Sequence, residues 1–291
     1  MLLQSLLRPV LTPLMRGMFD PSMGSPAWSP LALWPDGIAT PGMWISPRDL
    51  TSQWADYTGT TPVSVPGTVA DSANPVGLAL DIRAGATVLT DPGNHMLRST
   101  SVGRPLLSAY DGQTLGPGNT YDSAGYPVFQ KYDGVDDGMA TAAFAAGTLT
   151  SSMDCLIAVR RDSAARSPLG ICGDTGGGKF TGFVSDGDYP SNNLCGTPTV
   201  WVNNVQVAGG TNVRQNILNA AVPVGDWHIL EFRNLDLSGW DRVYYGYGLE
   251  TPAYIFNGAR GDILLYPSTT PTEDKDAARQ WLADYYGVTL P

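Results

Sequence analysis

Short hydrophobic runs bounded by turn-forming residues dominate the second half of the chain. Six of these runs are rich in β-branched and aromatic residues and have the length of strands. We therefore predict strands at residues 153–160, 180–185, 199–207, 227–232, 242–247 and 262–266. Asn203 and Asn204 interrupt the third run and indicate a hairpin, because asparagine tolerates the left-handed backbone of a tight turn. Strands without intervening helices favour antiparallel sheets, and hence a sandwich or a barrel.

One helix is predicted at the end of the chain. Its apolar positions recur at helical spacing, at Ala278, Trp281, Leu282 and Tyr285. Thr272 is the predicted N-cap, and the acidic residues that follow it suit the positive end of a helix dipole. Gly287 fits the position just past the last turn.

Residues 27–126 alternate short apolar stretches with turn signals such as Pro35-Asp36-Gly37 and Pro92-Gly93-Asn94. Glycine and proline account for 34 and 23 of the 291 residues, which suits a β-protein with many turns. Residues 42–45 and 76–82 are the strand candidates between these turns. We interpret residues 27–126 as a segment that wraps the sandwich, and residues 127–291 as the sandwich core with its closing helix.

Residues 1–26 have the character of an arm. Leucines are frequent, Pro9 and Pro13 disfavour a long helix, and Arg8 and Arg16 make the segment basic. Exposed leucines would be adhesive, so we expect the arm to dock the protein into an assembly through Leu7, Val10, Leu11 and Leu14. The alternative is an unpacked leader. Because the prolines and arginines interrupt its apolar run, we expect neither an export signal nor a transmembrane segment.

The charge and the cysteines narrow the classes of partner. A net charge of −10 and a low content of charged residues, 15%, argue against nucleic acid as the main partner. The chain has three cysteines, Cys155, Cys172 and Cys195. Their odd number argues against a disulfide framework, and their spacing is not that of a zinc site. We expect reduced thiols and folding in a cytoplasm.

An ordered set of motifs spans about residues 42–290. It comprises Trp44-Ile45-Ser46-Pro47-Arg48-Asp49-Leu50, Trp54 to Val63, Pro75 to Asp81, Gly93-Asn94-His95, Arg104-Pro105, Tyr132 to Asp137, Gly261 to Tyr266 and Trp281 to Val288. The order resembles laminin-G-like, concanavalin-like domains in structural proteins of tailed bacteriophages and prophages. The turn after Asp81 and the aromatic residue Tyr132 depart from the usual family pattern.

The resemblance implies an all-β fold, a two-sheet antiparallel jelly-roll sandwich with an extended N-terminal arm and one C-terminal helix. It also implies a place in the virion and a role in adhesion to host-surface glycans as part of the tail, a fibre or the baseplate. The alternative is decoration or cementing of the capsid or tail without a ligand. We expect other virion proteins as partners, through the arm, and a homo-oligomer.

Enzymatic motifs are weak. Residues 173–179 nearly spell a phosphate-binding loop, but Phe180 replaces the required Ser or Thr and a strand follows instead of a helix. The only glutamates, Glu231, Glu250 and Glu273, are scattered, so the paired carboxylates of a glucanase are missing. Neither His95 nor His228 lies near a nucleophile motif. We expect no enzyme, and a polysaccharide depolymerase is the least supported function.

Two kinds of binding site are candidates. Asp133, Asp136 and Asp137 surround a tight turn and could hold Ca²⁺, the only cofactor considered, although we favour the alternative that they cap the turn through backbone amides. Sugars bind to aromatic rings beside amides and carboxylates. The candidates for this role are Asp186, Asp188, Tyr189, Asn192 and Trp240, and Trp201 beside Asn203 and Asn204 is of the same kind. The alternative is that each aromatic belongs to the core.

Overall fold

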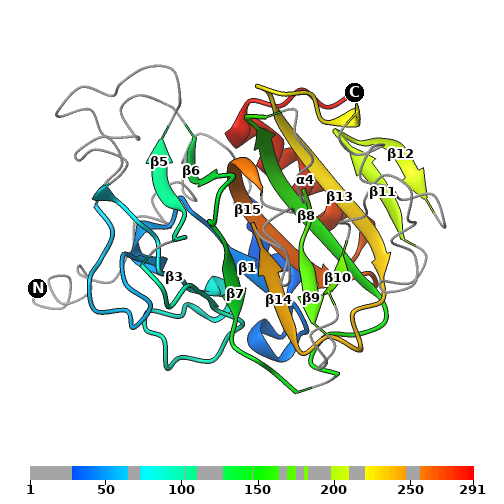
Figure 1. Cartoon of the computed structure of the whole chain (residues 1–291). Coiled ribbons are helices and arrows are strands. Elements are labelled where there is room, and N and C mark those ends of the chain that lie inside the picture. Colours follow the sequence, from blue (N-terminus) through cyan, green and yellow to red (C-terminus); the bar gives the residue numbers. More distant parts are fainter. Residues whose placement is uncertain are drawn as a thin grey trace, which may run out of the picture.

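Two antiparallel sheets and a C-terminal helix form the structure (Figure 1). The computed structural model describes residues 28–64, 73–101, 103–109, 127–145, 147–163, 169–174, 180–182, 198–209, 220–246 and 256–291. The α-helix of this part, α4 (Thr272–Tyr286), packs on the outer face of the larger sheet. The chain is therefore mostly β, as the sequence predicts.

The larger sheet has eight strands and the smaller sheet has seven. The order in the larger sheet is β12 (Val205–Gly209), β11 (Thr199–Val202), β13 (Trp227–Leu235), β8 (Met153–Arg161), β15 (Asn257–Pro267), β6 (Val128–Asp133) and β5 (Leu106–Ala109), and β1 (Met43–Ile45) pairs with the second half of β15. The order in the smaller sheet is β10 (Phe180–Gly182), β9 (Cys172–Asp174), β14 (Arg242–Tyr245), β7 (Met139–Thr141), β4 (Met96–Leu97), β3 (Leu78–Ala79) and β2 (Gln53–Trp54).

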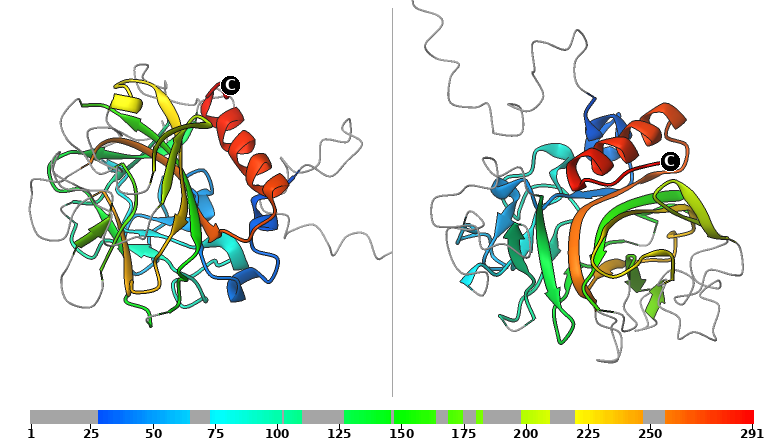
Figure 2. Two further views of the ribbon diagram at one scale, coloured as in Figure 1. Left: turned by 90° about the vertical axis from the view of Figure 1, so that its right-hand side faces the viewer. Right: turned by 90° about the horizontal axis from the view of Figure 1, so that it is seen from above.

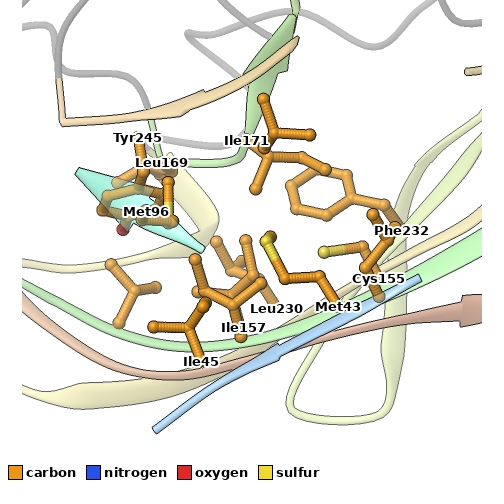
Figure 3. Packing of buried hydrophobic residues seen from close by; sticks show 14 of the residues in the cluster. Met43, Ile45, Met96, Cys155, Ile157, Leu169, Ile171, Leu230, Phe232 and Tyr245 are labelled. Carbon is orange, nitrogen blue, oxygen red and sulfur yellow. The ribbon is translucent and has the colours of Figure 1, made fainter. Parts of the chain in front are cut away.

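The main core lies between the two sheets (Figure 3). On β8, Cys155 and Ile157 point into this core, whereas Leu156 and Ala158 point to the other face, which α4 covers. Every residue of β8 is buried for this reason, and its sequence lacks the alternation of a half-exposed strand. Cys155 forms no disulfide, and burial raises the pKa of its thiol.

The predicted hairpin is confirmed. Asn203 and Asn204 have φ values of 49° and 66° between β11 and β12, in the left-handed region that the sequence required. The candidate strand at residues 76–82 is shorter than predicted. Its paired part is Leu78–Ala79, and a 3₁₀ turn, η5 (Ile82–Ala84), follows because the Asp81 carboxylate accepts the backbone N–H of Arg83.

Helix α4 begins at the residue that was expected to be its cap, one position earlier than predicted. Thr272 is the first helical residue and the cap position belongs to Pro271, which makes no side-chain bond, so the prediction of Thr272 as the cap is wrong. The backbone carbonyl of Pro271 accepts the N–H groups of Asp274 and Lys275, which are the ordinary first bonds of the helix. Gly287 ends the helix with a left-handed φ of 69°, as predicted.

Residues 28–109 contribute strands to both sheets. β1 and β5 belong to the larger sheet, and β2, β3 and β4 belong to the smaller one. The side chains of Met43, Val76, Met96 and Leu107 lie in the core between the sheets. Short 3₁₀ turns, η1 (Pro30–Leu33), η2 (Gly37–Ala39) and η3 (Leu50–Ser52), connect or precede these strands. This part of the chain is built into the sandwich and does not only cover it.

Candidate functional site

Three buried carboxylates fix helix α4 to the larger sheet. Glu231, Asp154 and Asp262 come from the neighbouring strands β13, β8 and β15, and none is more than 1% exposed. Glu231 pairs with Arg279 at 3.0 Å, and Asp154 pairs with Lys275 at 2.8 Å. Asp262 accepts the hydroxyl of Tyr286 at 3.0 Å. Since a buried carboxylate needs a partner, the helix is held in one position by charge as well as by its apolar face.

Arg48, which follows strand β1, connects this part of the chain to helix α4. Its guanidinium lies 3.5 Å from the ring centroid of Trp281 and 4.0 Å from that of Tyr285. It also pairs with Asp262 at 3.2 Å, and the indole N–H of Trp44 donates to the same carboxylate at 3.1 Å. Several motif residues that carry the phage-domain resemblance therefore meet in one network, although more than 200 positions separate Trp44 from Asp262.

The predicted acidic cluster is present in the turn between β6 and β7. Ligand atoms of Asp133, Asp136 and Asp137 all lie within 4.8 Å of one another. Asp133 accepts the N–H of Val135 at 2.7 Å, and Asp137 accepts the N–H of Asp133 at 2.8 Å. Asp133 and Asp137 thus accept backbone amides of the turn through one carboxylate oxygen each, Oδ1 and Oδ2 respectively, as the capping interpretation expects.

Asp137 is the unusual member of this cluster. It is 6% exposed, and burial raises the pKa of its carboxyl to about 7, with a further contribution from the charges of Asp133 and Asp136. The positive charge of Arg98 lowers the pKa of Asp137. A cation at the cluster would favour the ionised form of Asp137, so protonation and cation binding compete here.

The prediction that Trp240 binds a sugar is wrong, because the residue is buried. It is 1% exposed and belongs to the core between the sheets, where its indole lies against the backbone of Gly173 in β9. Glycine at that position leaves the space that the ring fills, so Trp240 is not available to stack on a sugar. The other candidates, Asp186, Asp188, Tyr189 and Asn192, lie outside the described residues, as do Leu7, Val10, Leu11 and Leu14 of the arm.

Of the glutamates and histidines that catalysis could use, Glu231, His95 and His228 have structural partners in the described part of the chain. Glu231 is shared by Arg233 and Arg279, and Glu273 lies in the exposed first turn of α4. Nδ1 of His95 accepts the N–H of Asp81 at 2.9 Å, and Nδ1 of His228 lies 3.0 Å from the amide of Asn203. Within the described ranges these contacts place no second glutamate beside Glu231 and no serine hydroxyl on either histidine.

Sequence reasoning missed the ion pairs under α4. Lys275 and Arg279 are ordinary residues of a helix surface in the sequence, and their partners lie 121 and 48 positions away. The available signal was the placement of Asp154 and Glu231 inside apolar strand segments, where an isolated charge is costly.

Comparison with known protein families finds no family model that matches the chain, and comparison with curated proteins finds no match. Among the described residues, no helix is long and apolar enough to cross a membrane.

Proposed function

We propose that the chain is a non-enzymatic virion protein of a tailed bacteriophage or prophage, with a jelly-roll sandwich that serves as a lectin-like adhesion module. The observation that carries this proposal is the network of Trp44, Arg48, Asp262, Trp281 and Tyr286. These motif residues join the helix to the sheet, together with the ion pairs of Glu231 and Asp154. Their burial in one network supports the fold that the resemblance implies.

Adhesion suits the surface chemistry better than catalysis does. The charge of −10 disfavours nucleic acid, and Glu231 is engaged by Arg233 and Arg279. The described surface includes half-buried aromatic and neutral polar side chains on strands, among them Trp201 and Thr199, and such groups are the chemistry of sugar recognition.

Localisation on purified particles tests the proposal. An antibody against residues 127–291 is applied with gold label to intact virions in the electron microscope. We expect label at the tail, fibres or baseplate. Label spread evenly over the capsid supports the decoration alternative, and particles without label contradict a virion function.

A further inference from the structure

The outer face of the larger sheet is only partly covered by helix α4. The helix packs against β13 and β8, while the hairpin of β11 and β12 lies beside it (Figure 2). This uncovered part contains a row of side chains that the strand register places on one face. Trp201 lies directly opposite both Gln206 and Glu231, and Thr199 lies opposite Arg233. Because directly paired residues of antiparallel strands share a face, these side chains form one surface.

The residues that alternate with this row along the strands show that the row lies on the outer face of the sheet. Val200, Phe232 and Ala208 alternate with the row and lie in the core between the sheets. Gln206 is exposed, and Thr199, Trp201 and Arg233 are half-buried. The strand geometry therefore presents an amide, a hydroxyl, an indole and a guanidinium to solvent from a rigid support.

Contacts within the row hold it in place. The indole N–H of Trp201 donates to the hydroxyl of Thr199 at 3.2 Å. The guanidinium of Arg233 lies 4.1 Å from the ring centroid of Trp201, and its Nε and Nη2 each donate to Glu231 at 2.8 Å. The ring and the guanidinium are thus fixed before any ligand arrives, which reduces the entropy lost on binding.

The charges around Arg233 favour an uncharged ligand over an anionic one. Arg233 is 27% exposed, but the buried carboxylate of Glu231 compensates its charge, and the second cation, Arg279, also pairs with Asp276. A net charge of −10 repels polyanions over the whole molecule. The surface therefore offers hydrogen-bond donors and a stacking ring without an excess of positive charge.

We propose that Thr199, Trp201, Gln206 and Arg233 form a binding surface for an uncharged glycan chain. A sugar ring packs on the indole, and its hydroxyls accept from Arg233 and bond to the amide of Gln206. This inference rests on the proposed adhesion function and assigns that function to the outer face of the β11–β12 hairpin.

The test uses the full chain on an array of neutral and carboxylated bacterial surface polysaccharides, followed by titration with the polysaccharide that binds best. Trp201→Ala is compared with Tyr57→Ala, which removes an aromatic residue that is 44% exposed in a loop of the smaller sheet. We expect binding to neutral glycans with little dependence on salt, a loss of about tenfold or more for Trp201→Ala, and no change for Tyr57→Ala. Arg233→Gln and Gln206→Ala repeat the test if Trp201→Ala lowers the melting temperature.

Three results overturn the inference. If all three variants keep the affinity of the unmodified chain, the glycan binds elsewhere. If the chain binds only carboxylated glycans, the ligand is not an uncharged glycan. If it binds no polysaccharide, the row is not a glycan-binding surface. Particle localisation decides the virion function separately, so the two proposals fail independently.

Discussion

Carboxylates that are similar in the sequence have different roles in the folded chain because their surroundings differ. Asp154 and Glu231 are buried beside cations, whereas Asp137 is buried beside two other carboxylates. The acidic cluster could be found from the sequence, since its members are close along the chain. The pairs under α4 could not, because each depends on how distant strands and the helix meet.

Asp137 makes stability depend on pH. Its folded pKa, about 7, lies above the ordinary value of 3.8, so its contribution to stability is complete below about pH 3.8 and is lost as the pH rises through 7. We expect Asp137→Asn to raise the free energy of unfolding by about 1–3 kcal/mol at pH 8 and to change it little at pH 4. Urea denaturation at both pH values measures this difference. Exposed Asp36→Asn is the control, and an equal effect of Asp137→Asn at both pH values contradicts the assignment.

Chelation distinguishes turn capping from calcium binding at the same cluster. Because the carboxylates of Asp133 and Asp137 already accept backbone N–H groups, we expect EGTA to leave the melting temperature at pH 8 unchanged. A lower melting temperature on chelation, absent in Asp137→Asn, would show that the cluster holds a cation.

Elements with strong local signals were predicted well, and their ends were predicted less well. The turn at Asn203 and Asn204 and the end of α4 at Gly287 follow from backbone preferences of single residues. The start of α4 does not, because the backbone becomes helical at Thr272 itself and leaves the cap position to Pro271, which makes no side-chain bond. Trp240 shows the same limit, since a tryptophan in a turn-like sequence is buried by its contact with distant Gly173.

The ion pair between Glu231 and Arg279 should contribute strongly to the docking of α4. Glu231→Gln leaves Arg279 buried, 6% exposed, without its main counter-charge, so we expect a loss of about 3 kcal/mol in the free energy of unfolding. Hydrogen exchange of the amides of α4 should accelerate as well. Asp276→Asn removes a partner that is 61% exposed and should cost no more than about 0.5 kcal/mol. Similar losses in both variants would contradict the importance of the buried pair.

At the scale of the whole molecule, two antiparallel sheets with a closing helix follow from the pattern of strands and from the terminal helical stripe. The order of strands within the sheets could not be predicted, because β1 pairs with β15 and β13 pairs with β8 across long stretches of sequence. Within residues 28–109, the sequence indicated the strands at 42–45 and 76–82 but not β2, β4 and β5, which are two to four residues long, and it did not indicate which sheet each strand joins.

The arm should serve assembly and not the fold of the domain. A protein that begins at Ala27 retains every strand described here, so we expect it to stay soluble and to melt near the temperature of the full chain. It should fail to join the particle or the oligomer, because burial of each leucine of the arm is worth about 1.5–3 kcal/mol. Unfolding of the truncated protein with normal assembly of the remainder would place the arm in the core.

Competition for adsorption tests the adhesion function most directly. The purified chain is added in excess to cells of the proposed host before the phage particles proposed to carry it, and the rate of particle adsorption is measured. We predict that the chain binds the cells and slows adsorption in proportion to its occupancy. Undiminished adsorption with no detectable binding of the chain to the cells would contradict an adhesion module.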